Sequence, residues 1–271
     1  MKIVNHRLEG EGITIHGSPN RGGALEPDSI VIHYTAGPTA ESAIRTLTDP
    51  NKKVSAHLVI ARDGGITQLV PFNAVAWHAG KSSYDGRSGF NKYAIGIEIV
   101  NAGRLTKSDN LYLAWFGKAY QEDEVMFAVH RNEHSATYWH RYSEEQIAIT
   151  EEICSLLRQD YPITHILGHE EISPNRKIDP GPAFPLDKLR EKILEPNRDQ
   201  DEADELPVAL TGNVIPEKLN IRTGPSVQQG KVARPLPKGK KVKILEKSDD
   251  WYRVAVEIEG WVSGQYIELE K

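Results

Sequence analysis

Three polar side chains interrupt apolar stretches or their ends in this 271-residue sequence: His33, Glu98 and His169. A buried polar group without a partner is costly, so each of these residues needs a partner or a chemical task. A lone histidine in a strand is most often a hydrogen-bonded core residue, but the nearby Asp179 changes that balance. Two histidines and one carboxylate are an ordinary ligand set for a catalytic zinc ion, with a fourth position left for water.

One half of this candidate zinc site lies in the segment GHEEISPNRKIDPGP, residues 168–182, which carries His169, Lys177 and Asp179. Proline restricts the unfolded backbone and so reduces the entropy lost when a loop becomes ordered. Three prolines break the segment: Pro174, Pro180 and Pro182. We therefore expect a stiff loop that holds His169 and Asp179, whereas a strand holds His33.

The hydrophobic pattern indicates the strands that must position these residues. Nearly continuous apolar runs predict buried strands at residues 29–36 and 94–100, the second with Glu98 in its middle. Two apolar runs around the Asp-Gly-Gly turn at residues 63–65 predict a hairpin. ITHILGH predicts one more strand, which ends at His169. For Glu98 the plainer interpretation, a strand residue that faces solvent, stays open.

Helices are expected on either side of the last strand. Residues 143–162 predict a helix with a capping box at Ser143 and Gln146, and Cys154 lies beside its apolar stripe of Ile149, Ile153, Leu156 and Leu157. PLDKLREKIL predicts a closing helix with proline at its start. Strands interleaved with helices predict an α/β (α+β) domain built on a central mixed β-sheet flanked by helices.

A composition change divides the chain into three parts. The segment LEPNRDQDEADELP is acidic, proline-flanked and almost without apolar residues, which is typical of a solvated linker. The residues after it form short apolar runs separated by Gly, Pro and Asn, which predict a small all-β barrel. We therefore expect a catalytic domain at residues 1–194, a linker at 195–208 and a β-domain at 209–271.

Composition and charge exclude several classes of protein. Hydrophobic residues make up 39% and charged residues 26% of the chain, as in an ordinary globular protein, and the net charge of -5 does not favour a nucleic-acid partner. The single cysteine excludes an internal disulfide. No segment approaches the roughly 20 apolar residues of a membrane span, and no signal-peptide pattern is present. As written, the chain is expected in the cytoplasm unless lysis or an export route releases it.

Four motifs together resemble the zinc-dependent N-acetylmuramoyl-L-alanine amidases of the type 2 amidase and peptidoglycan recognition protein family. They are VIHYTAG, VSAHLVIARDGGITQLVPFNAVAWHAG, AIGIEIVN and GHEEISPNRKIDPGP, and the resemblance spans roughly residues 29–194. It implies hydrolysis of the amide between N-acetylmuramic acid and the L-alanine of the stem peptide. The substrate is then peptidoglycan or a muropeptide, and the sequence leaves intact wall and small anhydro-muropeptides equally open.

The resemblance also implies a role for each polar residue. His33, His169 and Asp179 become the zinc ligands. Glu98 takes a proton from the attacking water and passes it to the leaving amine, and Lys177 places a cation beside the oxygen of the tetrahedral intermediate.

Trp77 and His78, in AWHAG, are then expected to line the cleft and bind substrate. A packed tryptophan beside a hydrogen-bonded histidine is the alternative at these two positions. His57 is interpreted as a structural histidine.

Two other functions compete with the zinc amidase. The segment VHRNEH matches the inverted zincin pattern through His130, Glu133 and His134, which would make the protein a metallopeptidase. The aromatic insertion around this motif would otherwise be a wall of the substrate groove or a solvated loop. A peptidoglycan-binding protein without turnover is the other alternative, against which the complete set of ligands and catalytic residues argues.

The C-terminal part resembles bacterial SH3-like domains through LNIRTGPS, WYRV and GWVSGQYI. The resemblance implies a cell-wall-binding module that raises the effective concentration of wall substrate. A lysine cluster fits either anionic wall polymers or the protection of a strand edge: Lys238, Lys240, Lys241 and Lys243. Trp251 and Trp261 are expected in the barrel core.

Overall fold

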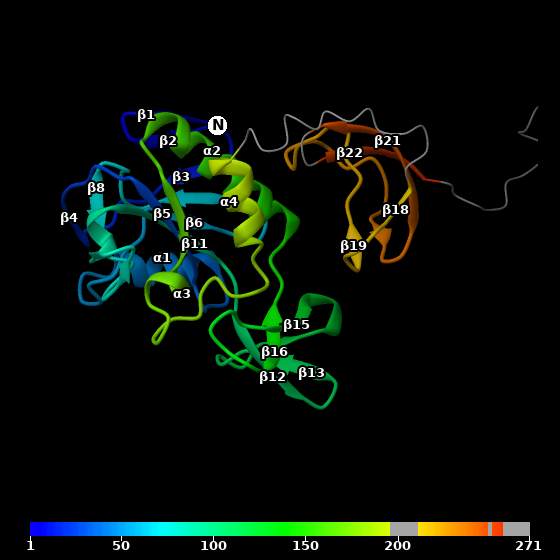
Figure 1. Cartoon of the computed structure of the whole chain (residues 1–271), viewed down its shortest axis with the longest axis horizontal. Coiled ribbons are helices and arrows are strands. Elements are labelled where there is room, and N and C mark those ends of the chain that lie inside the picture. Colours follow the sequence, from blue (N-terminus) through cyan, green and yellow to red (C-terminus); the bar gives the residue numbers. More distant parts are fainter. Residues whose placement is uncertain (196–210, 249–250, 257–271) are drawn as a thin grey trace, which may run out of the picture. The chain divides into compact units, whose positions relative to one another are not determined.

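The computed structural model describes residues 1–195, 211–248 and 251–256. The chain forms two compact units, residues 1–201 and 202–271 (Figure 1). The expected linker, residues 195–208, lies almost entirely outside the described residues, so its limits stay a prediction.

A six-stranded mixed sheet forms the centre of the first unit. Four neighbouring strands are parallel, and β6 and β7 form the antiparallel hairpin expected at the Asp-Gly-Gly turn. Their order across the sheet is β17 (His165–Gly168), β5 (Ser29–Tyr34), β11 (Ala94–Ile99), β6 (Leu58–Ile60), β7 (Ile66–Gln68) and β3 (Ile13–Ile15). The mixed sheet confirms the expected fold class.

Apolar side chains bury the middle strands on both faces, as their continuous apolar runs predicted. In β5 the run Ile30, Val31 and Ile32 has no exposed surface, and β11 buries its isoleucines to the same degree. Parallel pairing sets Glu98 of β11 directly beside His33 of β5. The two polar residues therefore share one face near the carboxyl ends of their strands.

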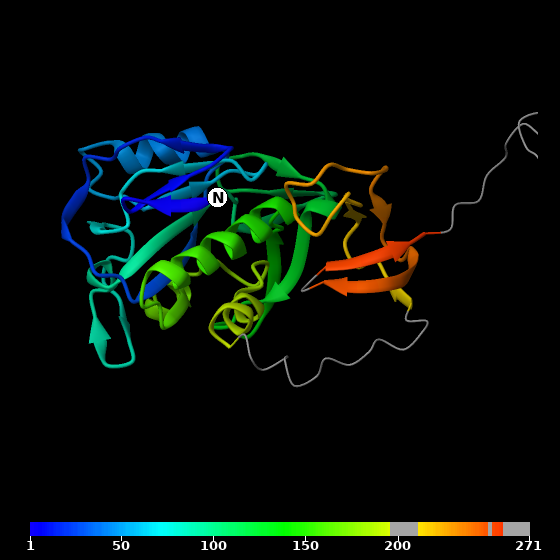
Figure 2. The ribbon, with the colours of Figure 1, turned by 90° about the horizontal axis from the view of Figure 1, so that it is seen from above.

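Helices cover both faces of the sheet (Figure 2). On one face α1 (Ala40–Thr48) packs Ala43 and Leu47 against Val59 and Val100. On the other face α2 (Glu144–Asp160) packs against α4 (Leu186–Leu194). Ser143 and Gln146 form the expected capping box of α2, and Cys154 is buried and free.

An antiparallel sheet occupies the aromatic insertion between β11 and α2. Its strands, in order, are β14 (Ala119–Tyr120), β13 (Leu111–Leu113), β12 (Arg104–Ser108), β16 (Ala136–His140) and β15 (Val125–Val129). Buried residues such as Leu105, Tyr112 and Tyr120 give it a small core of its own. A solvated loop, one of the two expectations for this segment, is therefore wrong.

Short elements complete the first unit. Three two-stranded ribbons pair β1 (Lys2–Val4) with β2 (Arg7–Glu9), β4 (Arg21–Ala24) with β8 (Ala74–Ala76), and β9 (Ser83–Tyr84) with β10 (Arg87–Ser88). Single helical turns are α3 (His169–Ile172), η1 (Phe90–Lys92) and η2 (Glu122–Glu124). The metal loop, defined as residues 168–182, therefore begins with a helical turn rather than with irregular chain.

In the described part of the second unit, the regular secondary structure is all β-strand. One sheet joins β18 (Thr211–Asn213), β21 (Lys241–Ser248) and β22 (Trp251–Ala255), and a second pairs β19 (Lys218–Leu219) with β20 (Leu236–Pro237). Trp251 is half-buried, whereas Trp261 lies outside the described residues. None of the helices in the described ranges has the length and apolar character needed to cross a bilayer.

Candidate metal and catalytic site

The carboxyl ends of β5, β11 and β17 bring the candidate site residues together. His33 lies near the end of β5, Glu98 is its neighbour on β11, and His169 directly follows β17. In sheets with parallel strands, ligands bind at this edge. The groove there has a volume of about 690 Å³, and its lining includes His33, His78, Glu98, His169, Lys177 and Asp179.

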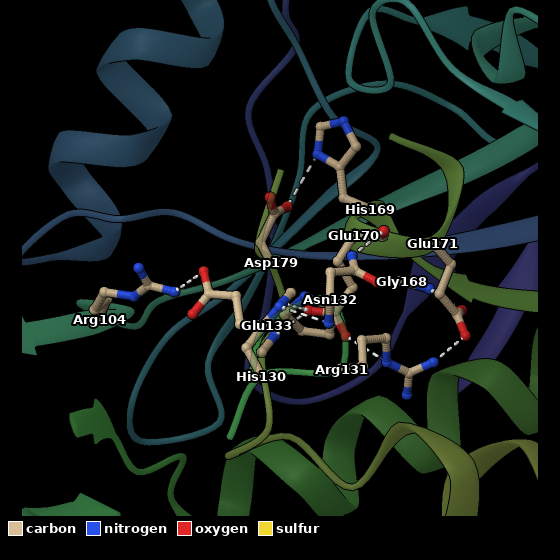
Figure 3. Close-up of polar contacts among 12 residues, drawn as sticks. Arg104, His130, Arg131, Asn132, Glu133, Gly168, His169, Glu170, Glu171 and Asp179 are labelled. Atoms are coloured by element: carbon tan, nitrogen blue, oxygen red, sulfur yellow. Dashed lines mark hydrogen bonds and ion pairs between the residues drawn. The ribbon is translucent and has the colours of Figure 1, made fainter. Parts of the chain in front are cut away.

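Three candidate metal ligands meet in a nearly equilateral triangle. His33 Nδ1 lies 2.9 Å from His169 Nδ1 and 3.0 Å from Asp179 Oδ2, and His169 Nδ1 lies 3.0 Å from the same oxygen. Figure 3 shows His169 and Asp179 facing each other across this gap. All three side chains are buried. Residues far apart in the sequence thus present three donor atoms to one point.

The hydrogen bonds of His169 indicate which of its two ring nitrogens carries the proton and which carries the lone pair. Nε2 lies 3.2 Å from the carbonyl oxygen of Ala79, which can only accept. Arg176 Nη2 lies farther from the same nitrogen, at 3.4 Å. We therefore place the proton on Nε2, so that Nδ1 points its lone pair at Asp179 and His33.

His33 is oriented in the same way through His78. His78 Nε2 lies 3.1 Å from the carbonyl oxygen of Ala94, so Nε2 carries the proton and Nδ1 accepts. The acceptor at His78 Nδ1 lies 3.0 Å from His33 Nε2, which therefore donates to it. The lone pair of His33 Nδ1 is left facing the triangle. Gly96 makes room for this chain of bonds, because a Cβ there would come within 2.4 Å of the His78 ring.

The triangle fits a metal ion. Burial lowers the pKa of His33 to about 4, so its ring is neutral at neutral pH. Two imidazole lone pairs and a carboxylate oxygen then meet at hydrogen-bond distance with no proton among them, and a cation satisfies all three. Tetrahedral zinc bonds of roughly 2.0–2.1 Å place neighbouring ligand atoms about 3.3 Å apart, close to this spacing.

Glu98 lies in the same groove with an unsatisfied carboxylate oxygen. Oε2 is buried and lacks a hydrogen-bond partner within the described residues. Burial raises the pKa of Glu98 well above its ordinary value, the negative charge of Asp179 adds to the rise, and Lys177 opposes it. A carboxyl group with a raised pKa is suited to accept a proton and return it.

Lys177 is held in the groove by the backbone of the metal loop. Its amide nitrogen donates to the carbonyl oxygen of Ser173 at 2.9 Å. The neighbouring Arg176 donates to the carbonyl oxygens of Ala79 and Lys81 at 3.0 Å each. Both adjacent cations line the groove, and Arg176 also anchors the loop through these two bonds.

Trp77 and His78, the expected substrate-binding pair, both line the groove. The backbone amide of Trp77 donates to Ser55 Oγ at 2.8 Å, so this N–H group is not free to bind substrate. Both ring nitrogens of His78 have protein partners, so only its carbon atoms could contact substrate. Substrate binding by either side chain stays a prediction.

The alternative zincin residues His130 and Glu133 have partners of their own in the structure (Figure 3). His130 Nε2 bonds to Glu170 Oε2 at 2.7 Å, Glu133 pairs with Arg104 at 2.5 Å, and His134 is exposed. Within residues 1–195, 211–248 and 251–256, the metal-sized group is the triangle of His33, His169 and Asp179.

The HRNEH segment instead braces the metal loop. Asn132 Nδ2 donates to the carbonyl oxygen of Glu170 at 2.9 Å, and Arg131 Nε lies 2.9 Å from Glu170 Oε1. Glu170 Oε2 also accepts from the amide nitrogen of Gly181 at 3.0 Å. This brace around Glu170 was not predicted from the sequence. Its only sign there is Glu170 itself, an acidic residue directly after His169.

The family comparison agrees with this site. The family described as N-acetylmuramoyl-L-alanine amidase matches residues 23–182, more than half of the chain, and the chain belongs to this family. The match confirms the resemblance drawn from the four motifs and the enzyme class that it implies. The bacterial SH3 domain family matches residues 217–268, which confirms the SH3-like interpretation of the second unit.

Individual relatives point the same way. The chain is 31% identical to the 1,6-anhydro-N-acetylmuramyl-L-alanine amidase AmpD of Citrobacter freundii over 60% of this chain and 79% of that one. It is 33% identical to the N-acetylmuramoyl-L-alanine amidase AmiD of Escherichia coli, over 60% of this chain and 52% of the relative. A crystal structure of AmpD superposes with a TM-score of 0.51 at 28% identity, covering 71% of this chain and 99% of the other.

Proposed function

We propose that this protein is a zinc-dependent amidase that hydrolyses the bond between N-acetylmuramic acid and the L-alanine of the stem peptide. The observation that carries the proposal is the close triangle of His33, His169 and Asp179 beside Glu98 Oε2, which has no hydrogen-bond partner among the described residues. Family membership and the names of its relatives support the choice of bond.

In this proposal zinc, when bound by the triangle, supplies a Lewis acid that polarises the scissile carbonyl and makes water more acidic. Glu98 Oε2 takes the proton of the attacking water as the new C–O bond forms. The same oxygen then delivers that proton to the nitrogen of L-alanine as the C–N bond breaks. The ammonium group of Lys177 stabilises the negative charge that develops on the carbonyl oxygen.

The second unit is proposed to hold the enzyme at the cell wall. Its SH3 family match supports this role, and the lysines of β21 supply positive charge for an anionic polymer. A tethered wall-binding module increases the local concentration of substrate without changing the chemistry. Binding of the intact chain to purified cell walls, with and without the anionic polymers extracted, tests this role.

A product analysis tests the reaction. The zinc-loaded protein is incubated with sacculi and with soluble muropeptides, and mass spectrometry follows the release of peptides with a new L-alanine amino terminus. We expect release that stops with a chelator and returns with zinc. Unchanged muropeptides in the presence of zinc would contradict the proposal, and binding without release would favour the non-catalytic alternative. Asp179→Ala provides the matched metal-free control.

A further inference from the structure

Trp115 is a tryptophan left open to solvent on a fixed turn. Its side chain is 78% exposed, whereas Trp139 of the same insertion is 1% exposed. The turn between β13 and β14 closes through bonds from Ala114 N to the Lys118 oxygen and from Gly117 N to the Ala114 oxygen, both 2.9 Å. Phe116, next in sequence, packs against the core of the insertion. Of the two neighbouring aromatic rings on this turn, Phe116 therefore packs inward and Trp115 stays exposed.

The position of the Trp115 ring is set by the central domain. Its Nε1 donates to the carbonyl oxygen of Ala36 at 2.7 Å. Ala36 has a φ of 48°, a left-handed conformation that residues with a side chain adopt only where their surroundings hold them. The polar atom of the indole is therefore satisfied by protein, and the exposed part of the side chain is its apolar ring surface.

This ring borders the catalytic groove. Trp115 and Ala36 line the same cavity as His33 and Glu98. Ala36 follows His33 by three residues, so its Cα lies at most about 11 Å from that of His33. Because the indole is hydrogen-bonded to Ala36, it lies close enough to the metal ligands to contact a part of the substrate beyond the scissile amide.

The charges of the groove indicate which part of the substrate lies at Trp115. The lining residues next in sequence to Ala36, the partner of Trp115, are uncharged: Thr35, Gly37 and Pro38. The charged lining residues come instead from β11 and the metal loop, namely Glu98, Arg176, Lys177 and Asp179. Two of these residues are acidic and two are basic, and the carboxylate at the end of a stem peptide is favoured near the basic pair, Arg176 and Lys177. A sugar ring is uncharged and has apolar faces that stack on an indole.

We propose that Trp115 forms a sugar subsite, in which its indole stacks on the N-acetylglucosamine joined to the muramoyl residue. The inference rests on the proposed amidase function and extends it to the substrate: the groove is built for a glycan-linked stem peptide rather than for a lone muramoyl peptide. The insertion that carries Trp115 is the specificity element of the site.

Matched substrates test this subsite. Hydrolysis is measured on the N-acetylglucosaminyl-N-acetylmuramoyl tripeptide and on the N-acetylmuramoyl tripeptide, for the full-length zinc-loaded protein and for Trp115→Ala. We expect kcat/KM on the disaccharide substrate to fall roughly tenfold, as for the loss of one stacked aromatic contact, and to stay within about twofold on the monosaccharide substrate. Phe127→Ala is the control, because Phe127 is 62% exposed on the same insertion and is absent from the groove lining.

Two further measurements separate stacking from a structural role and from failure of the proposed function. Trp115→Phe loses the bond to Ala36 but keeps an aromatic face, so it retains most of the preference for the disaccharide substrate. Calorimetric titration with peptide-free disaccharide reports the subsite even if neither substrate is hydrolysed, and Trp115→Ala weakens it. Equal loss on both substrates, or a titration that Trp115→Ala leaves unchanged, overturns the subsite.

Discussion

The candidate metal site depends on the direction in which the two histidine rings point their Nδ1 lone pairs, and not only on the types of its three side chains. His33 and His169 each donate from Nε2, to His78 and to the Ala79 carbonyl, and each points Nδ1 at Asp179. Such outer hydrogen bonds fix both the tautomer and the ring orientation of metal-binding histidines. The metal affinity of the site is therefore expected to depend on residues that do not touch the metal.

Replacing His78 tests this dependence. His78→Asn keeps an acceptor near the position of Nδ1, whereas His78→Leu removes it and leaves His33 Nε2 without a partner. We expect zinc affinity to fall by about 10- to 100-fold in His78→Leu and by less in His78→Asn. Competition with a chromophoric chelator measures both, and equal affinities in the two variants would exclude the orienting role.

Glu98→Gln separates proton transfer from metal binding. The amide is close to the carboxyl in size, but it cannot take a proton from water, so kcat should fall by about 10²- to 10⁴-fold. Zinc content should stay at the wild-type level, because Glu98 is not one of the three ligands. Stability should not fall, since burial already disfavours the charge of Glu98. Product release by chromatography, metal analysis and urea denaturation check the three expectations, and zinc loss in this variant would reassign Glu98 as a ligand.

At the level of elements, the sequence predicted those whose pattern is local. The buried strands β5 and β11, the hairpin of β6 and β7, and the capping box of α2 follow from apolar runs and turn residues. The insertion sheet did not, because its strands are short and its central pair, β12 with β16, joins segments far apart in the chain. Likewise the tie between Trp115 and Ala36 joins residues far apart in the chain, and no local pattern encodes such a contact.

The candidate site was predicted from residue types in the same partial way. His33, Glu98 and His169 stood out because each is polar where burial was expected, and Asp179 because it lies on the same loop as His169. The family resemblance supplied their roles. The partners that orient them did not stand out. His78 was assigned to substrate, and Glu170 was not singled out, since the bonds to His33 and His130 depend on tertiary contacts.

The brace between the insertion and the metal loop gives a prediction for two neighbouring histidines. His130→Leu leaves the buried Glu170 carboxylate without its 2.7 Å partner, so the free energy of unfolding should fall by about 2–3 kcal/mol. His134→Ala removes an exposed side chain and should change neither stability nor zinc content. Urea denaturation and metal analysis check both. Loss of zinc in His134→Ala, with zinc retained in His169→Ala, would instead support the metallopeptidase alternative.

At the level of the whole molecule, buried neutral histidines make stability depend on pH. Burial lowers the pKa of His57 to about 4, and burial, followed by the positive charges of Arg62 and Lys118, lowers the pKa of His140 to about 3. Below about pH 6.5 the unfolded chain therefore binds protons that the folded chain does not. Stability is complete above that pH and declines as the pH falls toward 4.

His57 alone should account for about 3 kcal/mol of this loss between pH 6.5 and pH 4. Its ring accepts from Gly96 N at 2.9 Å and lies 3.0 Å from the Ala74 carbonyl oxygen, away from the metal ligands. Urea denaturation of the metal-free protein at several pH values measures the slope. His57→Gln should reduce the slope whatever its own stability, and an unchanged slope would show that other groups carry the acid sensitivity.

The two ends of the insertion are tied together at its base. Asn101 Nδ2 donates to the His140 carbonyl oxygen at 3.0 Å, Ala102 N donates to His140 Nδ1 at 3.1 Å, and His140 N donates to the Gly103 oxygen at 2.9 Å. A segment whose ends are so close can be exchanged between proteins without disturbing the host sheet. Here the exchange is not neutral, because the same segment supplies the brace around Glu170. Exchanging the insertion between proteins is thus expected to change substrate choice and metal retention together.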